Sequence, residues 1–230
     1  MALTLFLELV VFLVARYSVD FLRKLEAFTS VVPSMPILEY SYWKFAVVVL
    51  LFIWLKVRGA KLSDYGLRNF GPIWLFLVIL VIAVASGILL PSIVDPIVES
   101  FLGSSQTETL SRFAALKGDL PLFLFVLPFG WVFAAFGEEF FYRGFLLENL
   151  RRILGGGAIA TVIAIICQGA LFGAAHYYQG MSGMITIGIG GIVLGLIYWA
   201  GGRRLWPMIA AHGIIDTIGL YAVYSGLMSA

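Results

Sequence analysis

The stretch LPLFLFVLPFGWVFAAFGEEFFYRGF, residues 120–145, is strongly apolar as far as residue 137 and then carries Glu138, Glu139 and Arg143. A run of about 20 apolar residues is long enough to cross a bilayer as a helix. On insertion scales a charged residue at the middle of a membrane helix costs roughly 2.5 to 3.5 kcal/mol, so three unpaired charges would approach roughly 8 kcal/mol. The stretch therefore predicts a membrane helix whose charges have partners or a chemical function.

The composition of the whole chain is that of a polytopic membrane protein. Of the 230 residues, 61% are hydrophobic and 12% are charged, whereas ordinary soluble domains contain about 25% charged residues. The mean hydropathy is +1.01. We therefore expect an all-α fold, with one membrane domain over residues 1–230, about seven transmembrane helices (six to eight) and additional interfacial helices.

Seven stretches are candidates for the transmembrane helices. They lie near residues 2–15, 42–57, 70–90, 120–148, 157–178, 182–201 and 205–228. Two connections, 16–28 and 94–116, mix charged and apolar residues at helical spacing, which is typical of interfacial helices, with solvated loop helices as the alternative. Pro91 and Pro96 are expected near helix boundaries, whereas Pro128 lies inside a span and is expected to kink it.

Several functional classes are excluded by what the sequence lacks. The net charge of +2 is too small to indicate a nucleic-acid partner. The single cysteine, Cys167, rules out an intrachain disulfide and a metal site built from several cysteines. Neither HExxH nor its reverse occurs, and no GxSxG motif is present, so a standard zincin helix and a nucleophile elbow are both absent.

The charges at residues 138–143 fall into two groups on a helix. Glu139 and Arg143 are four residues apart in the favourable order, so they are predicted to pair on one face. Glu138 is rotated about 100° from its neighbour and lies five residues from Arg143. It is therefore the unpaired carboxylate and a candidate general base or acid. The alternative is that all three charges only bridge neighbouring helices.

The two histidines of the chain also lie in apolar segments. His212 precedes Asp216 by four residues, so an imidazole and a carboxylate share one face of the last predicted span, which would fix the tautomer and favour the protonated ring. His176 ends the stretch LFGAAH, whose small residues allow close approach of another helix or a ligand. Two Glu and two His suit either zinc-assisted hydrolysis or hydrolysis by a Glu-activated water without metal.

Three motifs in this order resemble those of a known family. They are EExxxR (Glu138, Glu139, Arg143), FxxxH (Phe172, His176) and HxxxN/D (His212, Asp216). The pattern is similar to that of the CPBP family, the CAAX proteases and bacteriocin-processing enzymes, which are intramembrane endopeptidases related to the type II CAAX prenyl endopeptidase. The resemblance covers about residues 118–220, and KLSDYGLR at 61–68 is similar to an element that often precedes this core.

The resemblance implies a helical membrane core with its catalytic residues around a cavity between helices. It implies that Glu138 and His176 activate the attacking water and that His212 lies on the side that stabilises the oxyanion. Asp216 would share that side, but an ionised Asp cannot donate a hydrogen bond to an oxyanion. We therefore expect Asp216 to charge and orient His212 or to be protonated itself. Glu139 and Arg143 would hold the site together.

The resemblance also sets the expected cofactors and partners. We expect no cofactor, with zinc as the alternative. If zinc is bound, its ligands would be Glu138, His176 and His212. The enzyme would accordingly be a glutamate protease or a metalloendopeptidase. The expected partners are the lipid bilayer and a protein or peptide substrate, and no nucleic acid. The expected location is a prokaryotic plasma membrane. The sequence leaves the oligomeric state open. Two other functions stay open: a proton-coupled transporter with embedded Glu, His and Asp, and a non-catalytic scaffold of the same fold.

One geometric difficulty accompanies this interpretation. At 1.5 Å per residue, His176 lies about 29 Å along its span from residue 157, whereas His212 lies about 10 Å from the same nominal side. Straight spans that start at the same depth would not bring the two imidazoles together. The segment 157–178 is therefore expected either to enter the membrane late or to tilt strongly.

Overall fold

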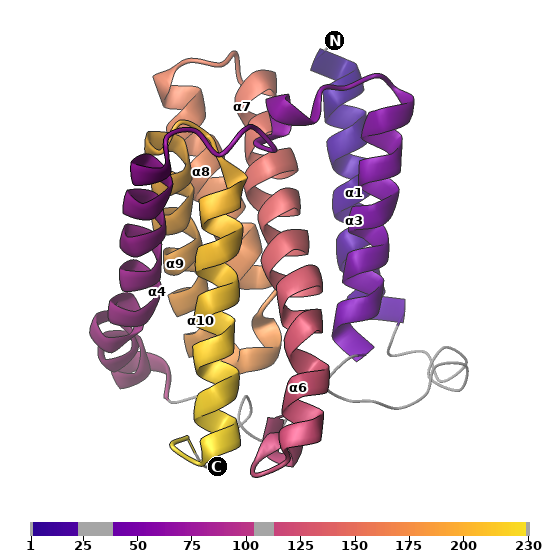
Figure 1. Ribbon diagram of the computed structural model, residues 1–230. Coiled ribbons are helices and arrows are strands. Elements are labelled where there is room, and N and C mark those ends of the chain that lie inside the picture. Colours follow the sequence, from indigo (N-terminus) through magenta and orange to yellow (C-terminus); the bar gives the residue numbers. More distant parts are fainter. Residues whose placement is uncertain (1, 23–38, 104–112, 229–230) are drawn as a thin grey trace.

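The computed structural model describes residues 2–22, 39–103 and 113–228. Within these ranges the regular structure consists of helices, and no strand is present. The predicted all-α fold is therefore confirmed. Figure 1 shows the long helices lying side by side, with the N-terminus at one end of the bundle and the C-terminus at the other.

The helices follow one another with short connections. Their bounds are α1 (Ala2–Leu22), α3 (Glu39–Val57), η1 (Leu62–Tyr65), α4 (Ile73–Leu102), η2 (Ala114–Leu116), α6 (Leu120–Phe129), η3 (Gly130–Phe136), η4 (Glu139–Leu147), α7 (Glu148–Ile153), α8 (Ala158–Ala174), η5 (Tyr177–Gln179), α9 (Gly180–Ala200) and α10 (Leu205–Ser225). The segments α6, η3, η4 and α7 form one continuous helix from Leu120 to Ile153.

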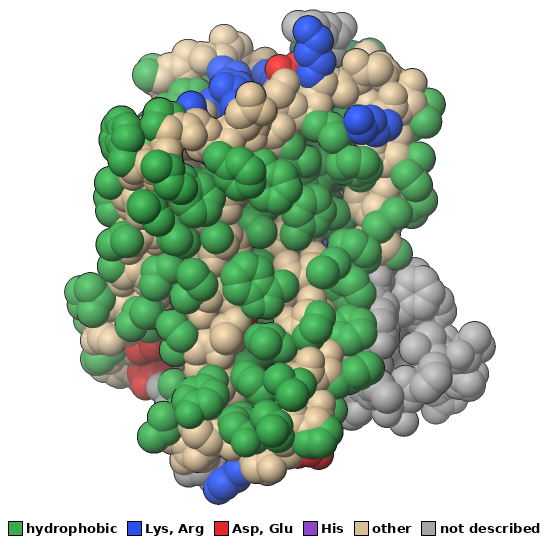
Figure 2. All heavy atoms as spheres, viewed as in Figure 1, with side chains coloured by type: hydrophobic (Ala, Val, Ile, Leu, Met, Phe, Trp, Pro, Cys, Tyr) green, Lys and Arg blue, Asp and Glu red, His purple; other side chains and the backbone are tan. Residues whose placement is uncertain are grey.

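Four helices of the described chain are long and apolar enough to cross a membrane. They are Ile73–Leu102, Leu120–Ile153, Tyr177–Ala200 and Leu205–Ser225, and the shorter α8 is also apolar. Figure 2 shows hydrophobic side chains over most of the flank, with Lys and Arg gathered at the end where α1 begins. An apolar flank with charges at the ends is what a bilayer requires. These features point to an integral membrane protein, while the count of seven spans stays a prediction.

The expected boundaries near Pro91 and Pro96 are wrong, because both prolines lie inside α4. Each proline removes one hydrogen bond from the helix, but apolar surroundings favour continued helix because exposed backbone groups would find no water there. The first parts of the two predicted interfacial segments also differ from expectation. Residues 16–22 belong to α1 and residues 94–102 belong to α4. Residues 23–28 and 104–112 of those segments lie outside the described ranges.

The helix from Leu120 to Ile153 changes its hydrogen-bonding pattern where the charges begin. After Pro128, it widens to π-type turns over Gly130–Phe136 and again over Glu139–Leu147. Such widened turns are rare and occur frequently at functional sites. The widening places Glu138 and Glu139 at the junction of two π-type segments, in the middle of the bundle.

Small residues allow α8 and α9 to pack closely. A Cβ atom added to Gly173 would lie 2.4 Å from the Met184 carbonyl oxygen and 2.8 Å from the Cα of Gly188. The Gln168 side chain crosses the same interface and donates a 2.7 Å hydrogen bond to the Gly191 carbonyl. This contact fixes the end of α8, and therefore the position of His176 just beyond it.

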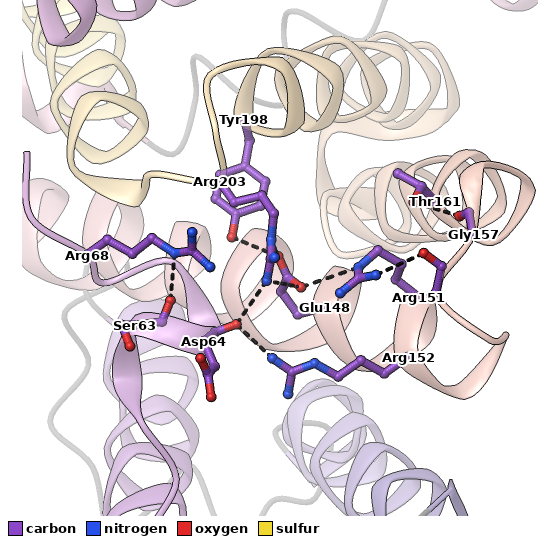
Figure 3. Close-up of polar contacts among 11 residues, drawn as sticks. Ser63, Asp64, Arg68, Glu148, Arg151, Arg152, Gly157, Thr161, Tyr198 and Arg203 are labelled. Atoms are coloured by element: carbon purple, nitrogen blue, oxygen red, sulfur yellow. Dashed lines mark hydrogen bonds and ion pairs between the residues drawn. The ribbon is translucent and has the colours of Figure 1, made fainter. Parts of the chain in front are cut away.

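A buried carboxylate joins several segments at the basic end of the bundle. Glu148 is 0% exposed and accepts hydrogen bonds from both Nε and a terminal nitrogen of Arg203, and a further one from the Tyr198 hydroxyl at 3.2 Å. Figure 3 shows these side chains converging from α7, from α9 and from the turn that follows α9. Burial alone would lower the pKa of Arg203, but hydrogen bonding and attraction from Glu148 raise it above the ordinary arginine value. Arg203 is therefore charged at physiological pH.

The same cluster reaches the N-terminal half of the chain. The backbone carbonyl of Asp64, in η1, accepts hydrogen bonds from Arg152 at 2.9 Å and from Arg203 at 3.3 Å (Figure 3). Nearby, the buried Glu8 of α1 accepts two 2.7 Å bonds from Arg58, which follows α3. The charges at this end are therefore paired across segments far apart in sequence.

Candidate active site

A cavity of about 520 Å³ lies within the bundle, between α4, α6, η3, α9 and α10. Its volume is in the range of ordinary ligand sites, roughly 300 to 1,000 Å³. Four predicted site residues line it: Glu138, His176, His212 and Asp216. The structure therefore brings together residues from three different segments of the chain. Most of the remaining lining is apolar.

The expected mismatch in depth between the two histidines is resolved by the ends of the helices. His176 lies beyond α8, in the turn that leads to η5, and in Figure 1 the α7–α8 connection lies above the start of α10. The ring of Phe172 is 4.8 Å from the His176 ring and 6.3 Å from the His212 ring, measured between centroids. Both imidazoles therefore contact the same aromatic side chain.

Glu138 and His176 face each other across part of the cavity. The distance from Glu138 Oε2 to His176 Nε2 is 3.9 Å, and each side chain is 11% exposed. The Nδ1 atom of His176 donates a 2.8 Å hydrogen bond to the Phe172 carbonyl, because a carbonyl oxygen can only accept. In the neutral ring, Nε2 is then an acceptor directed toward Glu138. The 3.9 Å separation is longer than a direct hydrogen bond and suits a bridging water.

Glu139 is the centre of a buried network behind the cavity. Its Oε1 atom accepts a 2.9 Å hydrogen bond from Arg143 and another of 2.9 Å from His212 Nδ1. Glu139 and Arg143 are both 0% exposed. The Arg143 guanidinium also lies 4.5 Å from the centroid of the Phe172 ring. The predicted pairing of Glu139 with Arg143 is therefore present, and it offsets the cost of burying both charges.

His212 lies between two carboxylates. Its Nε2 atom is 3.6 Å from Asp216 Oδ2, so the predicted proximity is present, although the distance is slightly too long for a hydrogen bond. Glu139, on the opposite ring nitrogen, is the nearer partner. The sequence linked His212 only to Asp216, because Glu139 is 73 residues away and no local spacing relates the two.

Two residues of the cavity wall, Lys44 and Tyr178, were not predicted from the sequence. Both line the same cavity as Glu138 and His176. Lys44 Nζ lies 5.6 Å from the centroid of the Tyr178 ring, and that ring lies 5.6 Å from the His176 ring. The signal for Lys44 was its position inside the predicted span 42–57, where a charge is as unusual as in 138–143.

The geometry does not provide the alternative zinc site. The proposed ligands were Glu138, His176 and His212, but Nδ1 of His212 is bonded to Glu139 and its Nε2 faces Asp216. His176 has its Nδ1 on the Phe172 carbonyl and only Nε2 directed toward Glu138. Throughout the described part of the chain, no group of three or more His, Cys, Asp or Glu side chains is arranged to hold a metal ion.

The fold and the site together define a class: a helical membrane protein with a Glu/His site in a cavity between its helices. Residues 120–218 match the family described as type II CAAX prenyl endopeptidase Rce1-like. This match agrees with the resemblance drawn from the motifs, and it supports a CAAX-type intramembrane endopeptidase in general. No curated protein and no solved structure matches the chain. The matched segment contains all six predicted site residues, whereas Lys44 lies outside it.

Proposed function

We propose that the protein hydrolyses a peptide bond in a membrane-associated or C-terminally hydrophobic protein or peptide, using a water activated by Glu138 and His176. The observation that carries this proposal is the 3.9 Å approach of Glu138 Oε2 and His176 Nε2 in the cavity. Both atoms are acceptors, so a water between them would donate one proton to each. Its oxygen lone pairs would then face the substrate.

In the first step Glu138 acts as the general base. It removes a proton from the bridging water while the water oxygen bonds to the carbonyl carbon of the scissile peptide. General-base catalysis of this kind contributes about 10² to 10⁴ in rate. His176 accepts a hydrogen bond from the same water and orients it, because its own proton is held on Nδ1 by the Phe172 carbonyl.

In the second step the tetrahedral intermediate collapses. We assign its negative oxygen to Nε2–H of His212, which acts as an imidazolium held between the carboxylates of Glu139 and Asp216. Glu138 returns the proton to the peptide nitrogen as the carbon–nitrogen bond breaks. The products are a new carboxylic acid and a new amine, and Glu138 is again ionised. The acid then releases the second proton of the water, which the amine takes up through solvent to give a carboxylate and an ammonium group. Arg143 fixes Glu139 and thereby His212, so it is a positioning residue.

The lining of the cavity supports an apolar substrate. Large hydrophobic side chains surround the polar end of the site, including Phe129, Phe133, Leu90 and Leu220. A peptide with polar side chains would lose hydrogen bonds to water when it entered such a cavity. The proposed physiological roles are maturation or sorting of membrane-associated proteins, or immunity to secreted hydrophobic peptides.

The experiment is cleavage by the full-length protein reconstituted in proteoliposomes. Membrane-protein precursors and hydrophobic peptides are incubated in ¹⁸O-labelled water with wild type and with His176→Ala, and fragments are identified by mass spectrometry. We expect new C-terminal carboxylates that carry ¹⁸O with wild type, and a loss of about 10² or more in rate with His176→Ala. Glu99→Gln, a change at a carboxylate outside the cavity lining, is the control.

Three results would contradict the proposal. Cleavage that persists at the wild-type rate in His176→Ala would remove this histidine from the reaction. Loss of cleavage with a chelator, and its recovery with added zinc, would replace the metal-free mechanism. Ion flux that depends on Glu138, in the absence of any cleaved peptide bond, would instead favour a transporter.

A further inference from the structure

Lys44 places a cation in the wall of the active-site cavity. It lies on α3, 8% exposed, and lines the cavity together with Glu138, His176 and Tyr178. Its ammonium group lies against the Tyr178 ring at 5.6 Å from the centroid. Lys44 lies in the predicted span 42–57, and a buried lysine in a membrane span is costly and by default marks a functional position.

The charges of the cavity wall are unevenly distributed. Among the lining residues that the structure describes, Lys44 is the only Lys or Arg, whereas Glu138 and Asp216 supply two carboxylates. The carboxylates lie near the histidines, and the Tyr178 ring lies 5.6 Å from both Lys44 Nζ and the His176 ring. A negative group on a substrate would be repelled by Glu138 and Asp216 and attracted by Lys44.

We propose that Lys44 binds a carboxylate of the substrate and thereby sets which peptide bond reaches Glu138. This inference rests on the proposed endopeptidase function. The carboxylate is either the C-terminal group of the substrate or an Asp or Glu side chain. Lysine suits this role because its ammonium is a compact point charge with three donors on a flexible stem. The role is one of positioning and specificity and involves no bond cleavage.

The distances limit how far the carboxylate lies from the cleaved bond. Both Lys44 Nζ and the His176 ring are 5.6 Å from the Tyr178 ring centroid, so they lie within about 11 Å of each other. An extended chain spans at most about 3.3 to 3.6 Å per residue. With a contact of about 3 Å at each end, the cleaved bond lies within about five residues of the carboxylate.

The test uses two matched pools of hydrophobic peptides, one with C-terminal acids and one with C-terminal amides, and the reconstituted full-length protein. Further pairs carry an internal Glu or Gln at increasing distances from the cleaved bond. Hydrogen bonds to charged groups are worth about 1.5 to 3 kcal/mol, so we expect wild type to prefer one carboxylate series over its neutral counterpart by about tenfold to a hundredfold in kcat/KM. In Lys44→Met this ratio should fall to about one, and Lys44→Arg should retain most of it.

Lys56→Met is the matched control. Lys56 lies on the same helix and also contacts an aromatic ring, Phe52, at 5.9 Å, but it is exposed and does not line the cavity. It should leave the acid-to-neutral ratio unchanged. Preference for the C-terminal acids identifies the terminal carboxylate, and preference for internal Glu identifies a side chain.

If wild type cleaves every neutral peptide with the same kcat/KM as its carboxylate counterpart, the proposed role of Lys44 is overturned. The endopeptidase function would remain intact. A preference that survives in Lys44→Met would have the same two consequences. If neither pool is cleaved, the proposed function itself fails, and the inference fails with it.

Discussion

At the residue scale, the site contains two adjacent glutamates with different environments. Glu138 lines the cavity and faces His176, whereas Glu139 is fully buried and bonded to Arg143 and His212. The local spacing of the sequence predicted this division, because only Glu139 is four residues from Arg143. It did not predict the bond from Glu139 to His212, because a contact across 73 residues depends on the packing of α10 against η4.

Asp216 provides a test of how the oxyanion is stabilised. An Asn amide can donate a hydrogen bond that an ionised Asp cannot, whereas Leu offers neither charge nor donor. We expect Asp216→Leu to lower kcat/KM about a hundredfold or more, because His212 loses a carboxylate that holds it as the imidazolium donor to the oxyanion. Asp216→Asn should stay within about tenfold of wild type, because its amide can donate to the oxyanion itself. Steady-state kinetics on one cleaved peptide measures both, and a wild-type rate in Asp216→Leu would contradict the assignment.

At the element scale, sequence patterns located the helices better than their ends. The apolar blocks identified every long helix that forms the site, but α4 continues through two prolines that were expected to end it. The π-type turns around Glu138 and Glu139 were also not predicted. Both features arise from tertiary packing in apolar surroundings, which a count of local propensities does not include.

The contact between α8 and α9 determines where His176 lies, and Gly173 and Gly169 are its tightest points. Gly173→Ala would place a Cβ within 2.4 Å of a backbone carbonyl oxygen, so the helices must separate. We expect a loss of about 1 to 3 kcal/mol in stability, seen as a lower Tm in a thermal-shift assay, together with reduced cleavage.

Gly219→Ala is the control for this change. It is also a glycine inside a helix, but a Cβ there has no atom within 4 Å. Its Tm should be equal to or above that of wild type, because Ala favours helix more than Gly does. If the two variants have the same Tm, the α8–α9 contact does not limit stability.

At the scale of the whole molecule, the buried Glu148 holds the basic end of the bundle together. It connects α7 with Tyr198 in α9 and with Arg203 in the following turn, and Arg203 also reaches η1. The sequence indicated that charges gather at the ends of spans. It could not indicate that residues 64, 148 and 203 meet, because three-dimensional packing alone relates them.

Removing the charge of Glu148 should therefore destabilise the whole bundle. In Glu148→Gln, Arg203 and Arg151 would lose their carboxylate partner. Breaking a buried ion pair typically costs about 3 to 5 kcal/mol of stability. Because both arginines are partly exposed, we expect a loss of about 3 kcal/mol or less. Thermal unfolding in detergent should show a clearly lower Tm, with Asp95→Asn, a change at a carboxylate on α4, close to wild type. An unchanged Tm would show that the cluster is not needed for stability.

The central claim is that Glu138 performs the chemistry while Glu139 maintains the site. The most direct measurement is kcat and Tm for two adjacent isosteric variants, Glu138→Gln and Glu139→Gln, on one peptide cleaved by wild type. We predict that Glu138→Gln lowers kcat about 10² to 10⁴-fold with Tm unchanged, and that Glu139→Gln lowers Tm because it leaves the buried Arg143 without its counter-charge. A Glu138→Gln variant that cleaves at the wild-type rate would contradict the account.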